Sequence, residues 1–204
     1  MFVQRIFIIV AFGFALSLAV QPMPAHADNT AENAEIFIAG LADQAIQALT
    51  TQELSQEERE KHFRVMLNDN FAIKTIARWV IGRHWKKASD AEKKEYLQLF
   101  EKLMVVTYVD KFSQYSGEQL KIVKSLLNNP KDTLVFSEIA RQGTQPIHVD
   151  WRVRTNDNVS FKIIDVLVEG VSMGQTQRSE FSSVIRQNGG KVEGLLAVLR
   201  KRVS

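Results

Sequence analysis

The chain of 204 residues has no cysteine and only four histidines. Without cysteine it forms no disulfide, binds no metal through thiolates and carries no cysteine-linked lipid anchor. The histidines share no H-x-x-H or H-E-x-x-H spacing, so no metal site is expected. The ten glycines form no phosphate-binding loop pattern, and no cofactor is expected either.

Long hydrophobic runs are scarce, and the one near the start is short. It extends from Ile6 to Val20 behind Arg5, whereas a membrane-spanning helix needs about 20 residues. Ala25-His26-Ala27 follows and is typical of a cleavage site. The sequence therefore predicts a cleaved signal peptide at residues 1–27, with an uncleaved anchor as the alternative. Residues 28–204 are enough for a single domain with its own core.

The sequence also lacks a large excess of charge of either sign, because its 26 Lys and Arg are interspersed with 23 Asp and Glu. The net charge is +3, and nothing in the pattern resembles a nucleic-acid-binding surface. Nucleic acid is therefore excluded as a partner.

The first half of the chain has helical periodicity. Apolar spacing predicts helices over residues 31–50, 55–67, 71–81 and 89–115. Ser55 and Ser89 each precede a glutamate by three residues, which is the capping-box spacing. The last of these helices carries two apolar stripes, together wider than an ordinary apolar face. It is either embedded in the core or lines a cavity with Met104, Tyr108 and Phe112.

In the second half the apolar period changes to two. Strands are predicted over residues 118–127, 133–141, 146–155 and 159–168, with turns short enough for an antiparallel meander. The last strand is apolar at both parities, which predicts cover on both faces. Helices over residues 178–187 and 191–202 follow. The expected fold class is α+β, with helices wrapped around a four-stranded antiparallel sheet.

Gly170-Val171-Ser172-Met173-Gly174 spells the G-x-S-x-G of a hydrolase nucleophile elbow between a strand and a helix. An elbow serine needs a histidine that follows it in the chain, and all four histidines come earlier. The sequence therefore favours a turn serine that satisfies nearby backbone over an esterase, and no catalytic residue is predicted. Asp165 on the preceding strand is interpreted as an ion-pair partner of Arg178.

Four motifs occur in a set order along the chain. They are Ile81-Gly82-Arg83-His84-Trp85, the stretch from Phe100 to Tyr108, Asp165-Val166 with Glu169-Gly170-Val171-Ser172, and Arg178-Ser179-Glu180-Phe181. In this order, behind a signal peptide, they resemble the MlaC (toluene-tolerance) family of periplasmic phospholipid-binding proteins. The tract Tyr115-Ser116-Gly117-Glu118 is similar to the hopanoid-associated branch of the same family.

The resemblance implies both a fold and a role. It implies that residues 28–204 form a single lipid-binding domain that is not an enzyme and holds acyl chains between its helices and sheet. The ligand would be a phospholipid or a hopanoid. Such carriers work in the periplasm of a Gram-negative bacterium and maintain outer-membrane lipid asymmetry. They exchange phospholipid between an outer-membrane lipoprotein complex and an inner-membrane ABC transporter with an MCE-domain subunit, with transient membrane contact.

The predicted lining of the lipid pocket combines the wide apolar helix with the apolar strand face. It consists of Val80, Trp85, Phe100, Met104, Tyr108, Phe112, Val149, Trp151, Val166, Val168 and Val171. Each of these residues also fits an ordinary core position. A pocketless periplasmic interaction domain is the alternative to a carrier.

Overall fold

A computed structural model describes residues 29–49, 54–113, 118–140 and 143–204. The predicted signal peptide lies outside these ranges. Within them, no helix is long and apolar enough to cross a membrane.

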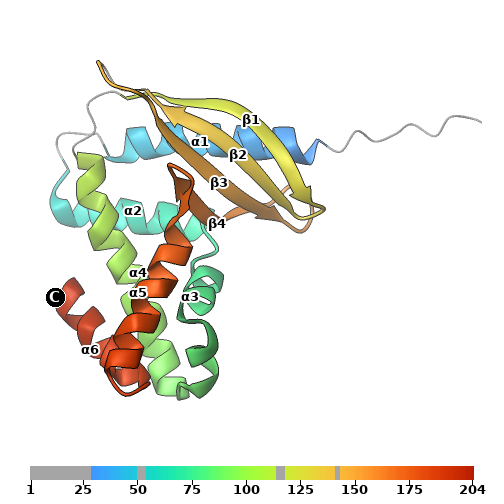
Figure 1. The fold of residues 1–204 in the computed structure, drawn as a ribbon. Coiled ribbons are helices and arrows are strands. Elements are labelled where there is room, and N and C mark those ends of the chain that lie inside the picture. Colours follow the sequence, from blue (N-terminus) through green and yellow to red (C-terminus); the bar gives the residue numbers. More distant parts are fainter. Residues whose placement is uncertain (1–28, 50–53, 114–117, 141–142) are drawn as a thin grey trace, which may run out of the picture.

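Six α-helices and one 3-10 helix are present in the described part of the chain (Figure 1). They are α1 (Thr30–Leu49), α2 (Gln56–Asn70), α3 (Ile73–Ile81), η1 (Gly82–Lys87), α4 (Asp90–Ser113), α5 (Met173–Gln187) and α6 (Val192–Val203). Both predicted capping boxes form, since Ser55 and Ser89 each exchange hydrogen bonds with the glutamate three residues on. The predicted end of the long helix near Tyr115 lies outside the described residues.

Some helix boundaries differ from the sequence prediction. The second helix was expected to break at Asn68, but α2 continues to Asn70. The third helix ends at Ile81 as predicted, and its C-cap Gly82 adopts a φ of 59°. Glycine is suited to this conformation because it has no Cβ to clash. The helix expected from Arg178 begins instead at Met173, with Ser172 as its N-cap.

The sheet is antiparallel with strand order β1-β2-β3-β4-β5, which confirms the predicted meander. Its strands are β1 (Leu120–Asn129), β2 (Asp132–Ile139), β3 (Ile147–Thr155), β4 (Phe161–Val168) and β5 (Val171–Ser172). The two-residue β5 was not predicted. It arises from a turn at Glu169 and Gly170, whose φ values of 50° and 75° are those of a type I′ hairpin.

A bulge at Ile164 explains why β4 is apolar at both parities. Arg152 pairs with Asp165 and Val153 pairs with Ile163, so Ile164 is an extra residue without an opposite partner. An inserted residue shifts the strand register by one and exchanges the two faces. Phe161 and Ile163 before the bulge, and Val166 and Val168 after it, therefore lie on one face, which we call the inner face.

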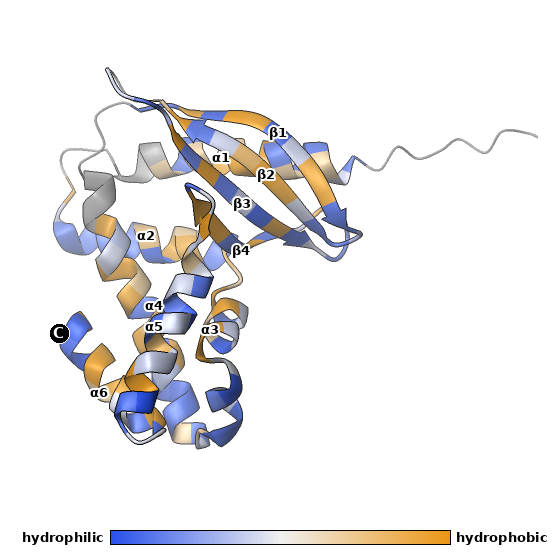
Figure 2. Cartoon of the chain, in the orientation of Figure 1, coloured by the Kyte–Doolittle hydropathy of each residue, from blue (hydrophilic) through white to orange (hydrophobic). Residues whose placement is uncertain are grey.

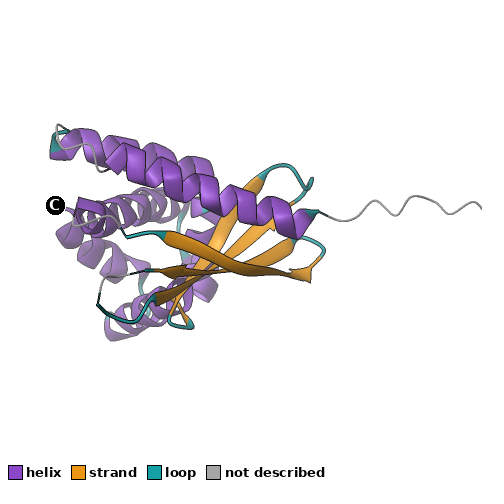
Figure 3. Ribbon diagram, turned by 90° about the horizontal axis from the view of Figure 1, so that it is seen from above, coloured by secondary structure: helices purple, strands orange, loops and turns teal. Residues whose placement is uncertain are grey.

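Helix α1 covers this inner face (Figure 3). Ala34, Ile38 and Leu41 recur at helical spacing and pack with Val135, Val153, Phe161 and Ile163 in one buried cluster, the sheet cluster. Hydrophobic and hydrophilic stretches alternate along the strands in Figure 2, as a sheet with one buried face requires. The outer face carries charged residues of β3 such as Arg152 and Arg154, whereas Asp165 and Leu167 on the outer face of β4 are half-buried beside the start of α5.

The remaining helices form a lobe beside the sheet, which we call the helical lobe (α3, η1, α4, α5 and α6; Figure 1). Its core, the helical cluster, is built around the rings of Tyr96, Phe100 and Phe181, whose centroids lie 5.9–6.3 Å apart. The buried hydroxyl of Tyr96 donates a hydrogen bond to the carbonyl of Ala77 at 2.9 Å. Burial raises the pKa of this hydroxyl, so it remains a donor.

Candidate functional site

The sheet cluster and the helical cluster meet at the end of α2. Met66 and Phe71 are half-buried and pack against both clusters. The backbone joins the two there as well, because Phe71 forms a parallel bridge with Ile163 and the N–H of Ala72 donates to the Ile163 carbonyl at 2.9 Å. We call the region where the clusters meet the seam.

Lys162 strengthens this junction. Its ammonium donates to the carbonyls of Asn68, at 3.2 Å, and of Asp69, in the last turn of α2. A cation placed there satisfies carbonyls that have no partner within the helix and favourably meets the negative end of the helix dipole. The edge of β4 is thereby tied to α2 immediately beside the seam.

On the helical side, five predicted lining residues belong to the helical cluster or pack against it. Val80 and Phe100 are fully buried in the helical cluster, whereas Trp85, Met104 and Tyr108 are half-buried and pack against it. Burial raises the pKa of the Tyr108 hydroxyl, which therefore stays neutral. The side chain of Phe112 lies outside the described residues.

On the sheet side, Trp151 and Val166 are paired across β3 and β4 and pack against the sheet cluster while remaining half-buried. The indole N–H of Trp151 donates to the hydroxyl of buried Ser137 at 3.0 Å, so its polar atom is satisfied within the inner face. Val149 is buried and its partner Val168 is half-buried. Val171 is 55% exposed in the short β5.

Two open depressions lie on the surface. One, of about 380 Å³, is on the outer face of the sheet and includes Glu138, His148, Asp150 and Glu169 among its lining residues. The other, of about 250 Å³, extends from Asp157 in the β3–β4 turn to Ala72 and Lys162 beside the seam. Neither is lined by any residue of the predicted pocket. Among the described residues, no group of three His, Asp or Glu side chains is placed to hold a metal ion.

The G-x-S-x-G motif forms a helix cap. Ser172 has φ −64° and ψ 121°, an ordinary extended conformation, whereas an elbow serine sits on a strained turn. Its Oγ accepts from the N–H of Gln175 at 3.0 Å and donates to Asp165 Oδ2 at 2.6 Å. The hydroxyl proton is thus directed at a carboxylate and not at a histidine, and the predicted role as a backbone-satisfying serine is confirmed.

Asp165 does tie β4 to the following helix, but the predicted partner was wrong. Besides Ser172 it accepts from the N–H of Gly174 at 3.1 Å, in the first turn of α5. The positive end of the α5 dipole favours a carboxylate at this position as well. Arg178 instead donates to the carbonyl of Trp79 at 2.9 Å, and its guanidinium lies 5.1 Å from the Trp79 ring centroid.

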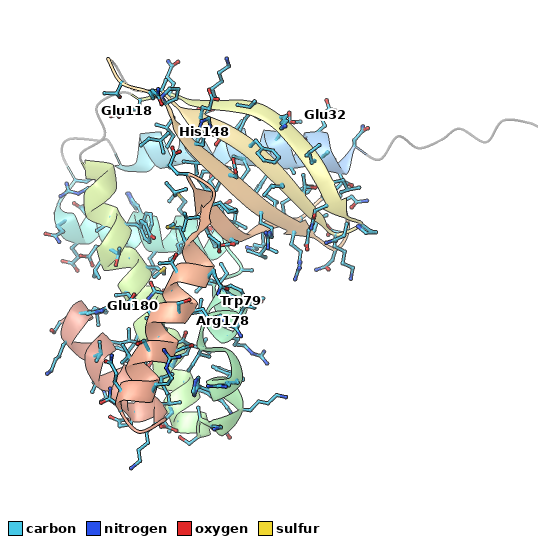
Figure 4. The ribbon with its side chains drawn as sticks, in the orientation of Figure 1. Glu32, Trp79, Glu118, His148, Arg178 and Glu180 are labelled. Atoms are coloured by element: carbon cyan, nitrogen blue, oxygen red, sulfur yellow. The ribbon has the colours of Figure 1, made fainter. Side chains whose placement is uncertain are left out.

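Figure 4 shows Trp79 and Arg178 side by side, one from α3 and the other from α5. A Cβ on Gly174 would stand 3.0 Å from a Trp79 ring atom and 3.1 Å from Asp165 Oδ1, so the absence of a side chain there permits this packing. Sequence reasoning overlooked Trp79. It also assigned Met66 and Phe71 to helices without recognising that they join two clusters, because that requires the contact between Phe71 and Ile163.

A solved structure shares this arrangement of helices and sheet. The phospholipid-binding protein from Ralstonia solanacearum, determined in complex with a phospholipid, matches with a TM-score of 0.74 at 19% sequence identity. The match covers 83% of this chain and 96% of that chain, and at such low identity it shows the fold alone. The predicted α+β fold class is therefore confirmed.

The family follows from the sequence itself. The family model described as MlaC protein matches residues 40–201. This chain belongs to the MlaC family, which confirms the resemblance found in its motifs. Membership indicates a binding or transport protein rather than an enzyme.

Proposed function

We propose that this protein is a periplasmic phospholipid carrier that holds acyl chains at the seam and moves lipid between the outer and inner membranes. The observation that carries the proposal is the pair of separately packed apolar clusters that share Met66 and Phe71 and keep half-buried apolar side chains at their margins. The Ralstonia solanacearum protein, whose structure holds a phospholipid, supports the choice of ligand.

The physical reason is the cost of moving a lipid through water. Burying one methylene contributes about 0.8 kcal/mol, so a two-chain lipid needs an apolar cover for the whole passage. A seam between two clusters can accept chains by separating its half-buried residues, without the loss of either buried core. Met104 and Met66 suit this role because their unbranched side chains adapt to irregular shapes.

The proposed route has two ends. The carrier would receive lipid from one membrane complex and release it to another, with an outer-membrane lipoprotein complex and an inner-membrane ABC transporter bearing an MCE-domain subunit as the partners. Signal-peptide cleavage after Ala27 would deliver the chain to the periplasm of a Gram-negative bacterium, with residues 28–204 as the lipid-binding domain. No catalytic residue, metal or cofactor is needed.

The first test is native mass spectrometry of the protein purified from its own periplasm, with organic extraction of the same sample. A stoichiometric mass excess that extracts as phospholipid is expected. A mass excess that extracts as hopanoid would assign the ligand to the hopanoid-associated branch. A protein that is bare and stays bare after incubation with phospholipid vesicles would contradict the carrier and favour an interaction domain.

The second test places the ligand with a matched pair of variants. Val166→Glu puts a carboxylate on the inner face beside Trp151, where burying it against acyl chains would be costly, and we expect lipid retention to fall at least tenfold. Val159→Glu is the control, because Val159 is 80% exposed in the β3–β4 turn. Circular dichroism checks that both variants fold, and Val166→Trp tests occlusion without charge. Equal retention by folded Val166→Glu and Val159→Glu would remove Val166 from the pocket.

A further inference from the structure

The positive charge of the chain is concentrated at one end of the helical lobe. Residues 78–94 contain six Lys and Arg against two acids, a net charge of +4, whereas the whole chain has +3. This segment comprises the end of α3, η1 and the start of α4, and its η1 part is hydrophilic in Figure 2. We call this surface, with Arg186 at the end of α5 and Lys191 at the start of α6, the basic end.

The cations of the basic end come close together in space. Arg78 and Lys93 flank the ring of half-buried Trp85, at 5.2 and 5.9 Å from its centroid. His84 is 5% exposed, and burial, together with the nearby charges of Arg83, Lys87 and Arg186, lowers its pKa. Three separate elements therefore contribute to one positive surface around a neutral imidazole.

Three of these cations have no anionic partner within the protein. Arg83, Lys86 and Lys87 are exposed, and none of them forms an ion pair in the described part of the chain, whereas Lys93 pairs with Asp90 at 3.0 Å. The basic run at the end of α6 differs, because Arg200 pairs with Glu95 and Glu193, and Arg202 pairs with Glu180. Like charges crowded on one exposed surface repel one another, so an external anionic partner is their natural complement.

We propose that the basic end docks the protein on an anionic phospholipid membrane surface. A membrane fits better than an acidic protein, because the cations are spread over the end of a lobe and neither of the two depressions lies there. A layer of mobile headgroups complements such a spread without matching fixed positions. Trp85, an amphipathic ring held between two cations, suits the headgroup level.

This inference rests on the proposed function for its purpose, since a carrier must meet membranes, but it is measured separately. The assay is co-sedimentation with vesicles of three parts phosphatidylethanolamine to one part phosphatidylglycerol, against vesicles of phosphatidylcholine alone. Binding to the anionic vesicles is expected to be at least about tenfold stronger than binding to the neutral ones. It is expected to weaken as the salt concentration rises from about 0.05 to about 0.5 M, because salt screens the attraction between the cations and the headgroups.

The decisive comparison uses two triple variants with the same change of net charge. Arg83→Glu/Lys86→Glu/Lys87→Glu reverses the basic end, and we expect a loss of about a hundredfold in affinity, from roughly a factor of five for each cation removed. Lys61→Glu/Lys102→Glu/Lys131→Glu reverses three exposed lysines on other elements and is expected to weaken binding by only a few-fold. If charge reversal prevents folding, Arg83→Gln/Lys86→Gln/Lys87→Gln is used in place of the first triple variant.

Each outcome separates docking from cargo binding, because lipid retention is measured in the same preparations. Loss of vesicle binding with retained lipid in the basic-end variant supports the inference. Equal weakening in both triples, or equal binding of the wild type to anionic and neutral vesicles, overturns it even if lipid is retained. A wild type that carries no lipid but binds anionic vesicles through this end contradicts the proposed function and leaves the docking surface in place.

Discussion

At the scale of single residues, a substitution of Ser172 distinguishes a hydrolase nucleophile from a helix cap. Its hydroxyl caps α5 and holds Asp165, so Ser172→Ala is expected to lower the free energy of unfolding by about 1 kcal/mol, a shift of roughly 2–4 °C in Tm. Ser179→Ala, on an exposed position of the same helix, is the control and is expected to change stability by less than about 0.5 kcal/mol. Lipid retention should be unchanged in both. An ester hydrolysis activity that Ser172→Ala abolishes would restore the nucleophile.

At the scale of elements, an ion pair between a buried aspartate and a partly exposed arginine joins the turns of two hairpins. Arg154 of β3 donates to both carboxylate oxygens of Asp132, at 2.6 and 2.8 Å, where β2 begins. The guanidinium of Arg154 lowers the pKa of Asp132 below its usual range, with a further contribution from Asn129. The charged carboxylate therefore stabilises the fold at neutral pH, and this stability is lost as the pH falls below about 4 through the lowered pKa.

Asp132→Asn tests this pair. The variant is expected to be less stable by about 1–2 kcal/mol at pH 7, at the lower end because Arg154 is partly exposed. The deficit should stay constant down to about pH 4.5 and shrink below that, when the wild-type carboxylate takes up its proton. Urea unfolding from pH 7 to 3 measures it, with Asp43→Asn on the exposed face of α1 as control. A deficit that does not shrink in acid would show that the charge of Asp132 contributes nothing.

Local patterns predicted the elements well where short-range chemistry determines them. The two capping boxes and the polar and apolar faces of β3 follow from neighbouring residues alone. The bulge at Ile164 did not follow, because it depends on pairing with β3 and leaves only an ambiguous parity in the sequence. The early start of α5 at Met173 was missed for a similar reason, since Asp165 supplies its acceptor from another element.

At the scale of the whole molecule, the candidate site is harder to predict than the fold. Sequence periodicity identifies apolar faces, but it cannot distinguish a residue at the centre of a cluster from one at its margin. Phe100 and Met104 lie one helical turn apart on α4, yet the first is buried in the helical cluster and the second is half-buried. Phe71 joins the two clusters through its contact with Ile163 of β4, which is distant in the chain.

This distinction between core and margin can be measured over the whole chain by hydrogen exchange with and without bound phospholipid. A ligand that binds the native state slows exchange wherever local opening is needed to admit it. We expect at least about tenfold slower exchange in three segments: Met66 to Ile73, the Met104 to Tyr108 turns of α4, and β4 around Val166. The turn between β1 and β2, which β3 separates from β4, is the internal control and should not change. Slower exchange confined to the strands around His148 and Glu169 would move the ligand to the outer depression, where charged side chains line the surface and acyl chains would lack an apolar cover.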